Sequence, residues 1–263
     1  MDVVDIIKNA LRYSVENYKT WTMMAVIFFI IGILQTAMTY KVGDVGEIIL
    51  GIIEFIFVLL ALGYSLQILK GQINGSFIDN DMIRLEEDFI GGIKAIIVLF
   101  IYEIIPLVIV LILSAIAGIS DQLTNIITIS ANGSEAAASL SAVPTNVMTT
   151  FMTSIVIISI IAFILYVICY LFSVIGFGKL AETNSMTEAL NFREVSSKIS
   201  SIGWGRYIVF IVATIIVLVI LGLISTLVGY IPVVGVIIAN TIVGSFTLLF
   251  ITSAIAGIYD DIA

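Results

Sequence analysis

Two acidic residues stand inside long apolar stretches of the sequence. Glu54 lies in the run 48–69, and Glu103 lies in the run 93–119. A charged side chain at the centre of a bilayer costs about 2.5–3.5 kcal/mol on insertion scales, so a residue of this kind is a candidate for function. No Lys or Arg lies deep in either run. Two readings stay open for each carboxyl: a neutral, hydrogen-bonded structural group, or a site for an ion, a proton or a substrate.

A second acidic pair, Asp79 and Asp81, is separated by one residue. Carboxylates at this spacing could hold Mg²⁺ against a diphosphate, as the transfer of lipid diphosphates requires. The neighbouring sequence gives this metal site weak support, because Arg84 stands where a second acidic turn is needed and no basic cluster faces the phosphates. A helix start capped by Asp79 or Asp81 is favoured instead.

The inventory of side chains narrows the chemistry further. The chain has no His and a single Cys, Cys169, which excludes zinc sites of Cys and His, catalysis by His, and internal disulfides. We expect no cofactor, no resident metal and no enzymatic activity.

Composition places the chain in a membrane. Its 263 residues are 60% hydrophobic and 11% charged, with a mean hydropathy of +1.21. Soluble domains have about 45–50% apolar and about 25% charged residues, so the excess of apolar surface must face lipid. A soluble enzyme and a disordered protein are excluded. Eleven Lys and Arg against nineteen Asp and Glu also exclude a nucleic-acid-binding domain.

Six stretches are long enough to span a bilayer as helices, for which about 20 mostly apolar residues are needed. None shows the short alternating pattern of a membrane β-barrel. The sequence therefore predicts an all-α, polytopic membrane protein, a single transmembrane domain over residues 1–263. The expected spans are 21–38, 48–69, 93–119, 151–175, 207–228 and 233–258.

Positive charge predicts the orientation of these spans. Ten of the eleven Lys and Arg lie in the N-terminal segment and in the second and fourth connections, while Lys41 stands alone in the first. Because positive loops stay inside, we expect both termini in the cytoplasm and the chain in the cell membrane. Residues 1–19 read as an amphipathic helix at the cytoplasmic interface rather than as a secretory signal. Of two sequons, only Asn132, in the predicted outer loop 120–150, is a candidate for glycosylation.

The second and fourth connections are alike. Each leads from a Gly-aromatic pair, Gly63-Tyr64 or Gly176-Phe177, through an amphipathic stretch to the glycines that open the next span. In the second case Ser185 and Glu188 form a capping box that predicts a helix start. Together with residues 1–19, these connections predict three units in sequence, each a cytoplasmic amphipathic helix followed by two spans.

These same residues carry a family resemblance. The segments 62–71, 189–195, 205–207 and 230–235 and the exit 256–259 resemble an uncharacterised prokaryotic membrane family, frequent in archaea, called domain of unknown function 4013. The chain is also similar to the six-span membrane anchors of some glycerophosphodiester phosphodiesterases. The resemblance implies a six-helix bundle and no particular reaction.

Three functions fit the sequence. The favoured one is a non-enzymatic membrane-organising, anchoring or lipid-interacting module, with membrane lipids as partners and without nucleic acid. The alternative is a transporter or channel-like bundle that uses Glu54 and Glu103. The third is a lipid-modifying enzyme, for which Asp79 and Asp81 would hold the metal. A membrane-protein partner or a homo-oligomer is compatible with each of them.

Overall fold

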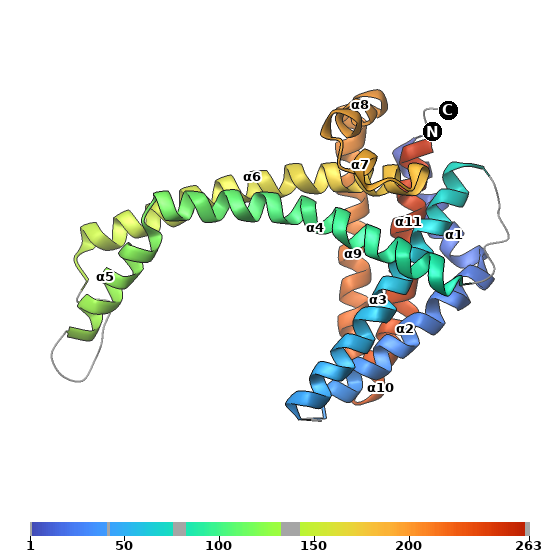
Figure 1. The fold of residues 1–263 in the computed structure, drawn as a ribbon, viewed down its shortest axis with the longest axis horizontal. Helices are drawn as coiled ribbons and strands as arrows, with labels where there is room; N and C mark the ends of the chain where they lie inside the picture. Colours follow the sequence, from blue (N-terminus) through green and yellow to red (C-terminus); the bar gives the residue numbers. More distant parts are fainter. Residues whose placement is uncertain (1, 41–42, 76–82, 133–142, 261–263) are drawn as a thin grey trace. The chain divides into compact units, whose positions relative to one another are not determined.

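The computed structural model describes residues 2–40, 43–75, 83–132 and 143–260, and in these residues every regular element is a helix (Figure 1). Six helical stretches are long and apolar enough to cross a membrane. The predicted all-α membrane fold is therefore confirmed. The elements are α1 (Val3–Glu16), α2 (Tyr18–Met38), α3 (Asp44–Ile73), α4 (Leu85–Ile116), α5 (Ile119–Asn132), α6 (Thr145–Thr183), α7 (Met186–Ala189), α8 (Phe192–Ile202), α9 (Trp204–Gly229), α10 (Val234–Ile238), η2 (Ala239–Gly244) and α11 (Ser245–Asp260).

The spanning helices extend beyond the apolar runs that predict them. The run 93–119 lies mostly in α4, which begins at Leu85 and ends at Ile116, three residues before the end of the run. The amphipathic residues from Leu85 onward therefore form the first turns of the span and no separate helix. Gly91 and Gly92 lie inside this helix although glycine costs about 1 kcal/mol in a helix interior. Their lack of side chains lets α4 approach α3 closely, which offsets that cost.

The described chain forms two compact units. Unit 1 comprises residues Met1–Leu99 and Phe172–Ala263, and unit 2 comprises Phe100–Leu171. Helices α4 and α6 each contribute residues to both.

The core of unit 1 lies between α2, α3 and α11. Two polar contacts tie these helices together: the Trp21 indole donates a hydrogen bond to Ser245 Oγ at 3.1 Å, and the Gln72 amide donates one to Ser253 Oγ at 3.1 Å. Apolar packing surrounds these contacts. The buried side chains of this core are Met24, Ile27, Ile31, Leu60, Ala61, Tyr64, Ile68 and Leu249.

Helix α1 confirms the amphipathic helix predicted near the N-terminus, and its apolar face packs on protein. Val3, Ile6 and Ala10 are buried, and α1 contacts α11 and α9. Ile6 fits against Gly257 of α11 so closely that a Cβ on that glycine would lie 2.8 Å from Ile6 Cγ2. The helix is thus a structural part of unit 1.

The last span contains a π-helix that the sequence does not predict. Residues Ala239–Gly244 form η2 between α10 and α11. A π-helical turn accommodates an extra residue in an α-helix and is frequent at functional sites. Here it carries Asn240 on the side that faces α2, where the Asn240 amide reaches Gln35.

Unit 2 contains α5 together with the adjoining parts of α4 and α6. The sequence predicts an outer loop over 120–150, and the structure places helix α5 in its first part. Ile126 of this helix is buried, while the hydroxyls of Thr124 and Thr128 bond to backbone carbonyls one turn earlier. Because these hydroxyls form their hydrogen bonds within the helix, the polar composition of this segment is compatible with helical structure.

Candidate functional site

Glu54 belongs to a chain of hydrogen bonds that joins three helices of unit 1. Gln35 of α2 donates from Nε2 to Glu54 Oε1 of α3 at 2.7 Å. Asn240 of η2 in turn donates from Nδ2 to Gln35 Oε1 at 2.9 Å, and also to the backbone carbonyl of Val236 at 2.9 Å. All three side chains are half-buried. The two amides therefore donate one after the other toward the carboxyl of Glu54: Asn240 donates to Gln35, and Gln35 donates to Glu54.

The depth of this chain places it inside a membrane-spanning segment. Glu54 follows the first residue of α3, Asp44, by ten positions, which corresponds to about 15 Å along the helix. The hydrogen bond from Gln35 satisfies Glu54 Oε1 away from water. Glu54 Oε2 and Asn240 Oδ1 have no hydrogen bond from the described residues. The geometry is therefore compatible with both readings of Glu54.

Glu103 belongs to unit 2, whereas Glu54, Gln35 and Asn240 belong to unit 1. The Glu103 side chain is exposed, whereas the preceding Tyr102 is fully buried. Among the described residues no hydrogen bond or ion pair involves Glu103. The common use of Glu54 and Glu103 by one site remains a prediction of the sequence, because the two residues belong to different units.

The other candidates from the sequence lie at the edge of the described residues or outside them. Asp79 and Asp81, the weak metal candidates, lie outside the described residues. Asn132, the glycosylation candidate, is the last residue of α5, and its side chain lies outside the description. Within the described ranges, no group of three or more Asp, Glu or Cys side chains could hold a metal ion.

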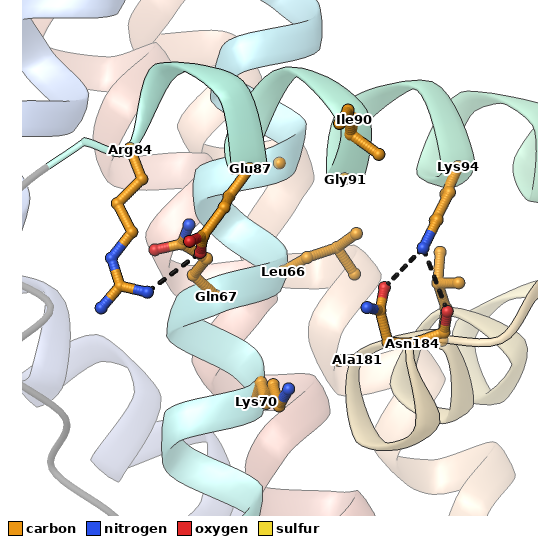
Figure 2. Close-up of a pocket in the computed structure, with 12 residues that line it drawn as sticks. Leu66, Gln67, Lys70, Arg84, Glu87, Ile90, Gly91, Lys94, Ala181 and Asn184 are labelled. Atoms are coloured by element: carbon orange, nitrogen blue, oxygen red, sulfur yellow. Dashed lines mark hydrogen bonds and ion pairs between the residues drawn. The ribbon is translucent and has the colours of Figure 1, made fainter.

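A basic pocket that the sequence does not predict lies in unit 1 between the end of α3, the start of α4 and the end of α6 (Figure 2). Its volume is about 310 Å³. Three cations line it against one carboxylate, with apolar side chains between them. The lining residues are Gly63, Leu66, Gln67, Lys70, Arg84, Glu87, Ile90, Gly91, Lys94, Leu180, Ala181 and Asn184.

The pocket lies beside a backbone-to-backbone crossing of α3 and α4. A Cβ on Gly63 would lie 1.6 Å from the Asp88 carbonyl oxygen, and one on Gly92 would lie 1.9 Å from the Leu59 carbonyl oxygen. Only glycine fits at such distances. The crossing fixes the positions of Gln67, one turn after Gly63 on α3, and of Glu87, directly before Asp88 on α4; both line the pocket in Figure 2.

Lys94 is held in place by the end of α6. Its ammonium donates to Asn184 Oδ1 at 2.9 Å and to the Asn184 backbone carbonyl at 3.3 Å. Asn184 has a φ of 55°, in the left-handed region that asparagine tolerates better than most residues. Both acceptors are neutral, so the positive charge of Lys94 keeps no carboxylate partner among the described residues.

The other two cations differ in their partners. Arg84 Nη1 pairs with Glu87 Oε2 at 2.9 Å, but the side chains are 50% and 64% exposed, so solvent weakens this pair. Lys70 is exposed and has no hydrogen bond or ion pair with any described residue. The Arg84 backbone N–H donates to Asp88 Oδ2 at 2.8 Å, which caps the start of α4. The pocket therefore carries a positive balance of charge.

A second polar cluster joins α6, α8 and α11 in unit 1. The Tyr259 hydroxyl donates to Glu182 Oε2 at 2.5 Å, and the Lys198 ammonium lies 4.1 Å from the centre of the Tyr259 ring. Burial lowers the pKa of Lys198 from its usual range. Lys179 Nζ lies 3.2 Å from Glu194 Oε2. These contacts hold α8 against α6 and α11. The charges of Lys179, Lys198 and Glu194 therefore have a structural role in the packing of these helices.

Sequence reasoning uses the three cations of the pocket only as markers of orientation. It finds no basic cluster near Asp79 and Asp81, whereas the structure brings Lys70, Arg84 and Lys94 to one pocket. The available signal is their position: each lies within about three turns of a helix end, and these ends belong to consecutive helices. Such ends meet at the same level of a bundle when the connection between them is short.

Comparison with known proteins identifies the family. No curated protein and no solved structure matches the chain. A family model described as "Protein of unknown function (DUF4013)" matches residues 48–230, a region that includes α4 to α9, most of α3 and every residue of the basic pocket. The chain, a helical protein with six helices suited to crossing a membrane, belongs to the DUF4013 family.

Proposed function

We propose that the chain is a non-enzymatic, lipid-interacting module of the cell membrane, with α1, α8 and both termini on the cytoplasmic side. The observation that carries the proposal is the spacing of exposed aromatic residues along the helices of unit 1. Tyr18 and Trp204 lie at the first turns of α2 and α9, Tyr40 lies two residues after the end of α2, and Tyr230 directly follows the end of α9. All four side chains are exposed.

The spacing corresponds to the thickness of a bilayer. At 1.5 Å per residue, Tyr18 and Tyr40 are about 33 Å apart along the helix axis, and Trp204 and Tyr230 about 39 Å. A bilayer is about 30 Å thick in its hydrocarbon and about 40–45 Å with its headgroups, and Trp and Tyr gather at these two levels. Both pairs fit the two interfaces. Between them α2 and α9 expose apolar side chains to lipid, among them Val26, Phe29, Ile33, Ile215, Val219 and Leu223.

Fluorescence tests this placement, because Trp21 and Trp204 are the two tryptophans of the chain. The variant Trp21→Phe leaves Trp204 alone. In vesicles that contain lipids brominated at known depths, we expect Trp204 to be quenched most by bromine near the headgroups. The control Trp204→Phe leaves Trp21, which is half-buried and bonded to Ser245, and we expect weaker quenching. Strongest quenching of Trp204 by bromine at the ends of the acyl chains would contradict the proposal.

The hydrogen-bonded chain of Glu54, Gln35 and Asn240 supports a second candidate, in which Glu54 transfers a proton or a cation. The hydrogen bonds form a continuous polar path across α3, α2 and η2, and Asn240 lies in the π-helix η2. Intramembrane carboxylates of this kind mark proton relays and ion paths in transporters.

Proton flux distinguishes the two candidates. If Glu54 transfers protons, vesicles that contain the wild-type chain lose an imposed pH gradient, and Glu54→Gln slows the loss at least about tenfold, because an amide cannot exchange a proton at neutral pH. The matched control is Glu47→Gln, at an exposed position in the first turn of the same helix. The lipid-interacting module predicts instead that wild-type and both variants hold the gradient equally.

A further inference from the structure

We propose that the basic pocket between α3, α4 and α6 is a phosphate-binding site, filled from the membrane by the headgroup of an anionic phospholipid. The proposal rests on the lipid-interacting function and names the ligand chemistry. In Figure 2 Arg84, directly before α4, and Lys94 of α4 lie at opposite ends of the pocket, with Lys70 of α3 below them.

The charges of the pocket select an anion. Three cations face one carboxylate, Glu87, which is already paired with Arg84. The charge of Lys94 is met by the two neutral oxygens of Asn184, and Lys70 has no partner among the described residues. A bound anion therefore gains charge-assisted hydrogen bonds without first breaking an ion pair of either lysine.

The donors of the pocket match the oxygens of a phosphate. Besides the two ammonium groups, Gln67 lines the pocket with a side-chain amide. Its Nε2 is buried without a well-formed hydrogen bond, and its side chain lies near the buried Asp88 carboxylate. An acceptor oxygen in the pocket would give this buried donor a well-formed hydrogen bond. Phosphate offers several such oxygens in a tetrahedral arrangement, whereas a halide offers a single point of contact.

The remaining lining favours a lipid as the source of the phosphate. Apolar side chains from all three helices, Leu66, Ile90 and Leu180, border the cations. A soluble phosphate would leave this apolar surface in contact with water, while the glycerol and upper acyl carbons of a phospholipid would cover it. The pocket also lies at the end of α3, which packs beside the start of α2 that carries Tyr18, where the headgroups are proposed to lie. Basic pockets between spanning helices are a known form of site for anionic headgroups.

Binding to the purified full-length chain tests the site. Native mass spectrometry in mild detergent measures the binding of phosphatidylglycerol and of phosphatidylcholine, and a parallel titration uses inorganic phosphate. We expect phosphatidylglycerol to bind most tightly and the double variant Lys70→Gln/Lys94→Gln to weaken its binding at least about tenfold, which corresponds to about 1.4 kcal/mol, because the variant removes two charge-assisted contacts. The matched control, Lys8→Gln/Arg193→Gln, removes two exposed cations outside the pocket and should leave binding unchanged.

A measurement on the wild-type chain guards against misfolding of the variant. Bound phosphatidylglycerol should protect Lys70 from an amine-reactive reagent and leave Lys8 reactive. Binding of inorganic phosphate with the same dependence on Lys70 and Lys94, but without phosphatidylglycerol binding, would overturn the lipid source.

Two outcomes overturn the site itself. One is equal weakening by the two double variants, and the other is equal reactivity of Lys70 with and without lipid. If general phospholipid contact, as reported by quenching of Trp204, persisted in either case, the lipid-interacting function would stand and only the pocket would be excluded.

Discussion

Gly63 lets the backbone of α3 lie directly against that of α4, because a Cβ at this position would lie 1.6 Å from the Asp88 carbonyl oxygen. We expect Gly63→Ala to push the helices apart and to destabilise the protein by about 1–3 kcal/mol or more, the usual cost of overpacking. The variant should also open or distort the adjoining pocket. Thermal unfolding in detergent measures the effect.

Gly51, in the same helix, supplies the matched control. A Cβ at this position would meet no atom within 4 Å. Since Ala exceeds Gly in helix propensity by about 1 kcal/mol, Gly51→Ala should leave the midpoint of unfolding unchanged or raise it slightly. Equal loss of stability in the two variants would show that helix–helix contact at Gly63 is not the cause.

At the scale of single residues, the sequence identifies charges that are unusual in their surroundings and misses their neutral partners. Glu54 is conspicuous because it interrupts an apolar run. Gln35 and Asn240 are not conspicuous, since neutral amides are less costly in a membrane, and 205 residues separate them. Lys70 and Lys94 are visible only as charges outside the hydrocarbon. Their shared pocket depends on a helix crossing that no local pattern encodes.

At the scale of elements, local signals predict helix starts better than they predict helix extents. The Ser185–Glu188 capping box is confirmed in part, since Ser185 Oγ accepts from the Glu188 backbone N–H at 3.4 Å. The helix expected after it is split into α7 and α8, because Asn191 forms a second cap with the Glu194 N–H. Helix α5 is missed because its Ser, Thr and Asn residues suggest a loop. The sequence does not predict the π-helix η2, because the residue pattern of Ala239–Gly244 is the same as that of an ordinary α-helix.

The carboxyls of Glu188 on α7 and Glu194 on α8 share a hydrogen bond that predicts linked titrations. This bond, followed by the negative charge of Glu194, raises the pKa of Glu188. The same bond, followed by one from Lys179, lowers the pKa of Glu194. By linkage, the stability that Glu188 contributes is complete below its ordinary pKa and is lost as pH rises through its raised value. The contribution of Glu194 is present above its ordinary pKa and is lost as pH falls through its lowered value.

Carboxyl-resolved NMR should therefore show Glu194 titrating at lower pH than Glu188. The variant Glu194→Gln removes the negative charge and the carboxylate acceptor, so the pKa of Glu188 should return toward its ordinary value. Glu16→Gln, which alters an exposed carboxyl of α1, should leave both titrations unchanged. A Glu188 titration that is the same with and without Glu194 would contradict the linkage.

At the scale of the whole molecule, composition and span length predict the six helices, and the count of Lys and Arg predicts their orientation. The structure is consistent with that count in one respect. The ten described Lys and Arg lie on α1 and α8, in the first turns of α2, α4 and α9 or directly before α4, and near the ends of α3 and α6. These elements meet at one end of unit 1 (Figure 1). The division into two units is not predicted, because it depends on which apolar faces meet and not on their number.

Labelling of single cysteines tests the orientation. In a Cys169→Ala background, Ser197→Cys marks the exposed face of α8, and Tyr230→Cys marks the turn at the other end of unit 1. We expect an impermeant maleimide to label Tyr230→Cys on intact cells and to label Ser197→Cys only after lysis. The opposite pattern would show that the chain is inverted.

Helix α1 leaves the ribosome before every other described helix, and α11 leaves after all of them. While the intervening helices are inserted, the apolar face of α1 therefore has no α11 to cover it, and the membrane surface is the apolar phase within reach. The nascent chain would hold α1 on the bilayer until α11 arrives and then exchange lipid for protein. Closure of unit 1 is in this way a late, post-insertional event, and a chain arrested before Ser245 would present α1 as a surface-bound helix.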